Sequence, residues 1–289
     1  MDVVWLGEPG AHDAGHVGGK AASLSRLAAN FRVPTGFVLT ANALRLAAPE
    51  LARGIVPPQL GVRIDEAYAR LGSDRVAVRS SALDEDGDAH SFAGQHETFL
   101  NVVGGEAIEE AVVLCFASAF TARALDYRLH VGLPVDHIGL AILVQAQILA
   151  DCAGVVFSAN PVNGRRDEIV INVSYGLGES IVGGTTTPDT FVVRKGDLEI
   201  LACTIGEKRL MTVPVAGGTL ELETPALLRD VPSVPDAVAL ELASLARRLE
   251  TDTGAPVDIE FAVKDGNVFL VQSRPITALP PAGAERGHR

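Results

Sequence analysis

The sequence has no run of basic residues. Its 289 residues carry 24 Lys and Arg against 36 Asp and Glu, so its formal net charge is -12 at pH 7. Proteins that bind nucleic acid or anionic membranes usually carry a basic patch, and no segment here predicts one. We therefore expect no nucleic-acid partner and no membrane partner. An anionic ligand would have to be held by a few local cations.

Cysteine is scarce, and long apolar runs are missing. The three cysteines, Cys115, Cys152 and Cys203, are widely spaced and form no C-x-x-C pair, which argues against a disulfide framework and against a zinc knuckle. No eighteen apolar residues follow one another, and the amino terminus lacks a basic segment followed by an apolar stretch. These features predict a cytoplasmic protein. With 47% hydrophobic residues, the chain can bury a sizeable core.

Several familiar catalytic motifs are incomplete. A Walker A motif ending at Lys20 would need glycine at position 14 and serine or threonine at position 21, and alanine occupies both positions. The segment from Gly176 to Gly178 has Ile181 where a dinucleotide fingerprint has its third glycine, which weakens a Rossmann interpretation. The sequence also contains neither His-x-x-x-His nor G-x-S-x-G, so it offers no metalloprotease or serine-hydrolase site.

The hydrophobic pattern predicts an α+β protein with two lobes. Helices are expected over 19–29, 57–72, 106–131 and 234–253, and strands over 33–40 and 76–82. From residue 138 the pattern changes to short β-rich segments, and Asp265-Gly266 predicts a hairpin turn between two of them. The expected division is one lobe over 1–137, a second over 138–277 and a flexible tail over 278–289.

Three segments of the first lobe could contact an anion. Gly18-Gly19-Lys20 opens a predicted helix, where backbone N–H groups and an ammonium could cradle phosphate, although such a segment is more often a plain helix start. Arg79 lies in an apolar strand and needs an anionic partner, either a ligand or a carboxylate. The small-residue loop from Ser91 to Gln95 could fold over phosphates or merely connect strands.

The strongest local pattern lies near the carboxyl end. Asp258 and Glu260 alternate along one strand, and Gln272 and Arg274 alternate along the next, so each pair projects to a single side. If the hairpin is in register, two carboxylates, a carboxamide and a guanidinium converge, as a site for Mg²⁺ and phosphate requires. The alternative is a solvent-facing strand pair with cross-strand ion pairs.

The order of these segments resembles the amino-terminal ATP-grasp domain of the phosphoenolpyruvate synthase, pyruvate phosphate dikinase and rifampin phosphotransferase family. The matching stretches cover nearly the whole chain. They are VGGKAASLSRL (17–27), VPTGFVLT (33–40), VAVRSSALDED (76–86), SFAGQHETFLNV (91–102), FTARALDYR (120–128), ILVQAQI (142–148), AGVVFSANPVNG (153–164), INVSYGLGESIVGG (171–184), TPDTFVV (187–193) and DIEFAVKDGNVFLVQSRPIT (258–277).

The resemblance implies ATP and Mg²⁺ as cofactors, bound between the two lobes of an ATP-grasp fold. It implies roles for the following residues: Lys20, Arg79 and Arg123 as phosphate-binding cations, Arg274 facing the terminal phosphates, Glu260 and Gln272 as Mg²⁺ ligands with Asp258 beside them, Ser91, Gly94 and Gln95 in a lid over the triphosphate, and Gln145 and Gln147 where the hinge meets adenine. Glu179 and Asp189 fall in stretches that flank the nucleotide cleft.

The implied function is that of a phosphotransferase. Family members pass a phosphoryl group to a histidine on a swivelling domain and then to a small molecule. The chain ends shortly after SRPIT, so we expect a separately encoded phosphohistidine-domain partner. The alternatives are a self-contained ATP-grasp kinase or ligase and a non-catalytic nucleotide-binding subunit. The segment between VLT and VAVRSS is shorter than the family usually has, which predicts a trimmed first lobe.

Overall fold

The computed structural model describes residues 3–84, 97–130, 132–133, 135, 138–277 and 279–280. The chain divides into two compact units: unit 1 is Met1–Gln147 with Val215–Gly218, and unit 2 is Ile148–Pro214 with Thr219–Arg289. The sequence-based boundary after residue 137 was too early. Strand β5 (Leu140–Ala146) pairs inside the sheet of unit 1, so the chain leaves that unit only after Gln147. Each unit combines a sheet with helices, which confirms the α+β class.

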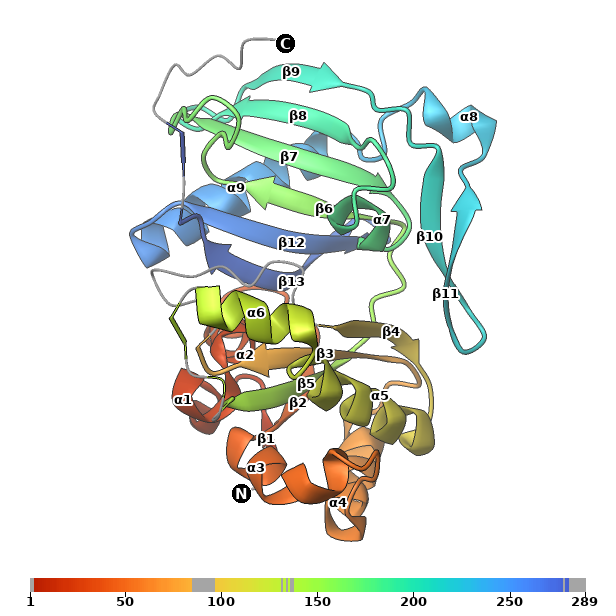
Figure 1. Cartoon of the computed structure of the whole chain (residues 1–289). Helices are drawn as coiled ribbons and strands as arrows, with labels where there is room; N and C mark the ends of the chain where they lie inside the picture. Colours follow the sequence, from red (N-terminus) through yellow and green to blue (C-terminus); the bar gives the residue numbers. More distant parts are fainter. Residues whose placement is uncertain are drawn as a thin grey trace. The chain divides into compact units, whose positions relative to one another are not determined.

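Unit 1 is built on a five-stranded antiparallel sheet (Figure 1). Its strand order is β1-β2-β5-β3-β4, with β1 at Val3–Trp5, β2 at Gly36–Leu39, β3 at Val76–Ala82 and β4 at Thr98–Val102. Strand β3 coincides with the predicted strand over 76–82 and is buried along its whole length. Arg79 therefore lies on a strand that is buried along its whole length.

Helices cover both faces of this sheet, because its strands alternate apolar side chains between two cores. Phe37 and Leu39 of β2 pack in one core with three helices, whereas Val38 packs in the other with two shorter ones. The first group of helices is α3 (Ala41–Leu51), α4 (Pro58–Leu71) and α5 (Gly105–Ser118); the second is α1 (Ala14–Val17) and α2 (Gly19–Leu27). The sheet is thus an internal scaffold.

The single helix expected over 106–131 is two helices, α5 and α6 (Ala122–His130). The break has a local cause at Thr121. Its hydroxyl oxygen accepts a hydrogen bond from the N–H of Ala124 at 3.3 Å, as an N-cap does at the start of a new helix. The apolar period alone did not reveal this cap, because it continues on both sides of the break.

Unit 2 is built on a six-stranded antiparallel sheet with the order β13-β12-β6-β7-β8-β9. The strands are β6 (Cys152–Phe157), β7 (Glu168–Tyr175), β8 (Asp189–Arg194), β9 (Ile200–Thr204), β12 (Val257–Lys264) and β13 (Asn267–Pro275). Helix α9 (Asp236–Thr253) crosses one face of this sheet (Figure 1) and matches the predicted amphipathic helix. Its buried residues, such as Leu242 and Leu249, recur at the helical period.

Two further strands form a separate two-stranded sheet. Strands β10 (Leu210–Val215) and β11 (Gly218–Glu223) form a hairpin that is followed by the short helix α8 (Ala226–Arg229), while α7 (Glu179–Val182) follows β7. The tip of the hairpin is grouped with unit 1. There the side-chain amide of Asn101 donates to the carbonyls of Val215 at 2.6 Å and Gly218 at 2.7 Å.

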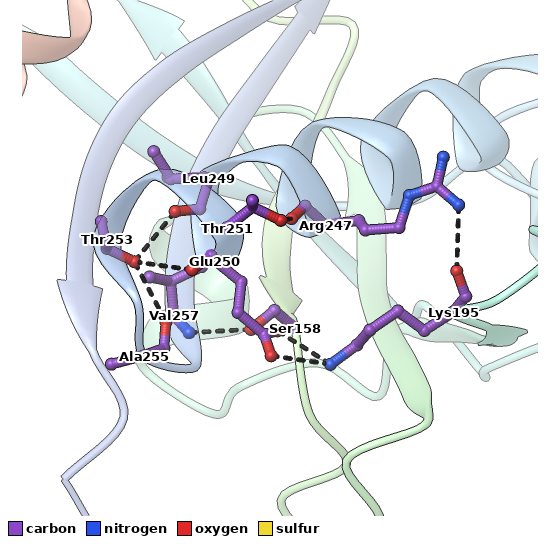
Figure 2. A network of polar contacts seen from close by, with 9 residues as sticks. All are labelled: Ser158, Lys195, Arg247, Leu249, Glu250, Thr251, Thr253, Ala255 and Val257. Carbon is purple, nitrogen blue, oxygen red and sulfur yellow. Dashed lines mark hydrogen bonds and ion pairs between the residues drawn. The ribbon is translucent and has the colours of Figure 1, made fainter.

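A polar network fixes the end of α9 and the start of β12 (Figure 2). Lys195 Nζ lies 2.8 and 3.0 Å from the two carboxylate oxygens of Glu250, and Arg247 donates to the Lys195 carbonyl at 3.1 Å. At the other side of the network the N–H of Val257 donates to the Ser158 hydroxyl oxygen at 2.8 Å. The strand that carries Asp258 and Glu260 therefore begins from an anchored position.

Candidate functional site

The hairpin β12–β13 brings four polar side chains to one face of the sheet of unit 2. Asp258 pairs with Arg274 and Glu260 pairs with Gln272, as the sequence pattern required. Directly opposed residues of an antiparallel ladder project to the same side, so the four form one cluster. The turn is Asp265-Gly266, as predicted, and both residues have positive φ values, 50° and 74°, which suit a type I′ turn.

A register shift between Glu260 and Phe261 makes this convergence possible. Near the turn Lys264 pairs with Asn267 and Phe261 with Leu270, a register that would place Val271 opposite Glu260 if it continued. The shift adds one residue to β13 and places Gln272 there instead. Without it Gln272 and Arg274 would lie on the other face from Glu260, because a slip of one residue reverses the side of every side chain.

Asp258 and Arg274 form a close ion pair. The guanidinium donates from Nε at 2.8 Å and from Nη2 at 2.7 Å, both to Oδ2 of Asp258. Asp258 is only 7% exposed. Burial raises the pKa of Asp258 above its usual value, while the charge of Arg274 and its hydrogen bond lower that pKa. The carboxylate therefore depends on Arg274 for its charge compensation.

In unit 1, Lys20 lies against strand β3, the strand that carries Arg79. Lys20 Nζ lies 3.4 Å from the Ser80 carbonyl, and the N–H of Ala21 donates to the Ser81 hydroxyl oxygen at 3.2 Å. Gly18 has a φ of 80°, and a Cβ there would lie 2.2 Å from the Ser81 carbonyl oxygen. Only glycine permits this close approach of α2 to β3.

The cations of unit 1 differ in their surroundings. Arg79 is 9% exposed, whereas Arg123 is exposed on α6. Arg128, on the same helix, is 2% exposed and forms an ion pair with Asp84. This buried arginine was not predicted from the sequence. Its signal in the sequence was the position four residues after the buried Ala124, on the covered face of the helix.

The two glutamines expected near adenine occupy different environments. Gln145 is 2% exposed and donates to the Pro34 carbonyl at 3.0 Å, so its amide serves the packing of unit 1. Gln147 is half-buried, and its side-chain oxygen lies 3.4 Å from the N–H of Asn101. Of the two, Gln147 is the better placed for contact with a ligand. The predicted lid residues Ser91, Gly94 and Gln95 lie outside the described residues.

Unit 2 contains a buried ion pair of which the sequence indicated only one partner. Asp189 and Lys208 are both 0% exposed and in contact, and Lys208 Nζ also donates to the Val231 carbonyl at 2.8 Å. The other carboxylate oxygen of Asp189 accepts from the N–H and the hydroxyl of Ser233, each at 2.7 Å. The pair joins the segments on either side of the β10–β11 hairpin, so its role in this structure is to hold the base of that hairpin.

No helix in the part of the chain that the structure describes is long and apolar enough to cross a membrane.

Residues 47–288 match the family described as pyruvate phosphate dikinase, AMP/ATP-binding domain. The chain belongs to this family. Membership agrees with the ATP-grasp fold that the order of motifs implied. As a pyruvate phosphate dikinase AMP/ATP-binding domain, the chain carries the Asp258, Glu260, Gln272 and Arg274 cluster inside the matched region.

Curated relatives support the same assignment. The chain is 37% identical to a protein named "Probable phosphoenolpyruvate synthase" from Methanothermobacter thermautotrophicus, over 98% of this chain and 47% of that protein. It is 38% identical to a rifampicin phosphotransferase from Streptomyces sviceus, over 92% of this chain and 34% of that protein. It is also 38% identical to the prodigiosin synthesizing transferase PigC from Serratia marcescens, over 90% and 31% respectively. The chain thus spans about half the length of these relatives or less.

The residues of this AMP/ATP-binding domain fit a magnesium-nucleotide complex. Glu260 and Gln272 offer a carboxylate and a carboxamide oxygen from directly opposed positions, with Glu260 half-buried and Gln272 7% exposed. Among the described residues no three His, Cys, Asp or Glu side chains gather into a complete protein-made metal site. Magnesium typically takes one or two protein oxygens and completes its shell with phosphate and water, which this pair permits.

Proposed function

We propose that this domain binds Mg-ATP and cleaves it to phosphorylate a histidine on a separate partner domain, from which the phosphoryl group passes to a small-molecule acceptor. The observation that carries the proposal is the pairing of Glu260 with Gln272 and of Asp258 with Arg274 on one face of a sheet, in a chain of the AMP/ATP-binding family. Relatives named as a phosphoenolpyruvate synthase and a rifampicin phosphotransferase support phosphoryl transfer as the activity.

Each residue has a defined task in this proposal. Glu260 and Gln272 would hold Mg²⁺, which when bound neutralises charge on the phosphates. Arg274 would face the terminal phosphates, and Lys20, Arg79 and Arg123 would bind phosphate oxygens. At an effective dielectric near 20, a cation about 4 Å from a phosphate charge contributes roughly 4 kcal/mol before desolvation, so several such groups would stabilise the transferring phosphate in a chain of net charge -12.

The partner requirement can be tested with the nucleotide products. The purified chain is incubated with Mg²⁺ and ATP labelled in the β or γ phosphate, alone and with the remainder of the Methanothermobacter relative supplied as a separate polypeptide. We expect label on a histidine of that polypeptide and nucleotide cleavage only in its presence. A variant of the polypeptide without that histidine is the matched control.

The other outcomes are equally specific. Cleavage of ATP that needs only a small molecule would contradict the partner model and identify a self-contained kinase or ligase. Tight Mg-ATP binding without cleavage under any of these conditions would identify a nucleotide-binding subunit without chemistry.

A further inference from the structure

The backbone that carries Asp258 is held on both sides. It lies on β12, which is paired on both sides: Asp258 is opposite Arg274 on β13 and opposite Phe157 on β6. Its N-terminal neighbour Val257 is tied to Ser158. The backbone that carries this carboxylate is therefore fixed from two strands.

The ion pair uses one particular edge of the guanidinium. Nε and Nη2 of Arg274 both donate to Oδ2 of Asp258, so two donors in the rigid plane of the side chain point at one acceptor atom. This arrangement determines the orientation of the plane, and with it the direction of the other guanidinium N–H groups.

The same contact makes Asp258 a poor ligand for magnesium. Its Oδ2 already accepts two charge-assisted hydrogen bonds at 2.7 and 2.8 Å, and a cation bound to that oxygen would lie beside the positive charge of Arg274. Glu260 is one ladder step further along the same face, opposite an uncharged carboxamide. The two carboxylates of β12 are thus in different electrostatic settings.

We propose that Asp258 is a positioning residue that orients Arg274 toward the terminal phosphates of ATP, and that it is not a magnesium ligand. This inference rests on the proposed function, because it assigns the division of labour within the same site. Arg274 and Glu260 contact the phosphates and the metal, and Asp258 acts through Arg274 alone.

The test measures nucleotide affinity by calorimetry on the full chain, so it needs no partner domain. The variants are Asp258→Asn, Arg274→Ala, the double variant, and Glu260→Gln, each titrated with ATP and with AMP over a range of Mg²⁺ concentrations. We expect Asp258→Asn to bind ATP about tenfold more weakly, equivalent to about 1.4 kcal/mol, and to bind AMP unchanged. In the Arg274→Ala background the same substitution should change ATP affinity less than about twofold, since coupled residues are not additive.

The Mg²⁺ requirement separates the two roles. Asp258→Asn should leave the Mg²⁺ concentration for half-maximal ATP binding unchanged, whereas Glu260→Gln should raise it. The matched control is Asp151→Asn, which removes the carboxylate of another β12 ion pair, with Lys264 at 2.7 Å, in an exposed position. We expect that control to bind both nucleotides like the wild type, and the melting temperatures of all variants show whether they are folded.

Three results would overturn the inference while leaving the proposed function intact: wild-type ATP affinity in a folded Asp258→Asn protein, an equal loss of ATP and AMP affinity, or a raised Mg²⁺ requirement that persists without Arg274. Failure of the wild-type chain to bind Mg-ATP would instead overturn the proposed function, and the inference with it.

Discussion

Glu260 and Gln272 are directly opposite each other on neighbouring strands, one ladder step from the ion pair of Asp258 and Arg274. Neither belongs to the apolar core: Glu260 is half-buried, and Gln272 presents a carboxamide from a 7% exposed position. Their placement gives two side chains with oxygen atoms on opposed positions of the ladder.

Replacement of Glu260 by glutamine should lower ATP turnover about 100-fold in the presence of the partner polypeptide, because the change removes the charged metal ligand and keeps the size of the side chain. Turnover is measured by release of labelled phosphate or nucleotide. Asp265→Asn is the matched control, since it removes a carboxylate from the exposed turn of the same hairpin and asparagine tolerates the positive φ of 50°. Similar turnover in the Glu260→Gln protein and the wild type would refute the metal assignment.

Asp189→Asn and Lys208→Met should each lower the free energy of unfolding by about 3–5 kcal/mol, because each leaves a fully buried charge without its partner. The double variant should lose less than the sum of the two. Urea denaturation provides the measurement. Glu207→Gln is the control, because Glu207 pairs with Arg209 at 2.7 Å with both side chains more than 60% exposed, and such pairs contribute about 0–1 kcal/mol. Equal effects of the buried and exposed substitutions would contradict the anchoring role of Asp189.

Asn101→Ala should destabilise unit 1 by about 2 kcal/mol or more. The substitution removes two hydrogen bonds to the tip of the β10–β11 hairpin and one from Arg75 at 2.6 Å, and it forces alanine into a φ of 57°. Asn101→Gly separates the two causes, because glycine accepts this backbone conformation but also lacks the amide. We expect thermal unfolding to rank the proteins as wild type, then Gly, then Ala. A glycine variant as stable as the wild type would show that the hydrogen bonds contribute little.

The buried cysteines should make stability fall at alkaline pH. Burial raises the pKa of Cys115 and of Cys152 to about 12. In the unfolded chain these thiols ionise near 9.0, so the unfolded state loses protons first and stability declines as the pH rises from about 9 toward 12. The Cys115→Ala protein should show a shallower decline between pH 9 and 11 in urea denaturation, and an unchanged slope would contradict the prediction.

At pH 8 iodoacetamide should label the exposed Cys203 before the buried Cys115 and Cys152, as measured by mass spectrometry.

The local pattern of the sequence was sufficient for the elements with strong periodicity. Strand β3, helix α9 and the Asp265-Gly266 turn were all predicted, because their apolar spacing or turn chemistry is encoded within a few residues. The break between α5 and α6 was missed, since a single threonine cap decides it. Strand β5 was assigned to the wrong lobe, because its membership depends on pairing with β2 and β3, which are distant in sequence.

The candidate site was likewise predicted only in part from the sequence. The alternation of Asp258 with Glu260 and of Gln272 with Arg274 was visible in the sequence, and their registration is confirmed. What local spacing could not reveal was which carboxylate is paired with the arginine, or that Gln145 is committed to the Pro34 carbonyl. The buried partners Arg128 and Lys208 were missed for a related reason: a charged side chain looks like a surface residue until its counter-ion is located.

The register shift at Glu260 has a consequence for how this hairpin tolerates change in length. The ladder next to the turn and the ladder at Glu260 and Gln272 differ in register by one residue, and Val271 is the extra residue between them. Because Val271 is this extra residue, deleting it would leave Gln272 opposite Glu260 and Arg274 opposite Asp258 in an uninterrupted register, with the four polar side chains still on one face. If the ladder instead paired Val271 with Glu260, Gln272 and Arg274 would turn to the opposite face from both acids, so the hairpin tolerates the loss of Val271 but not its entry into the pairing.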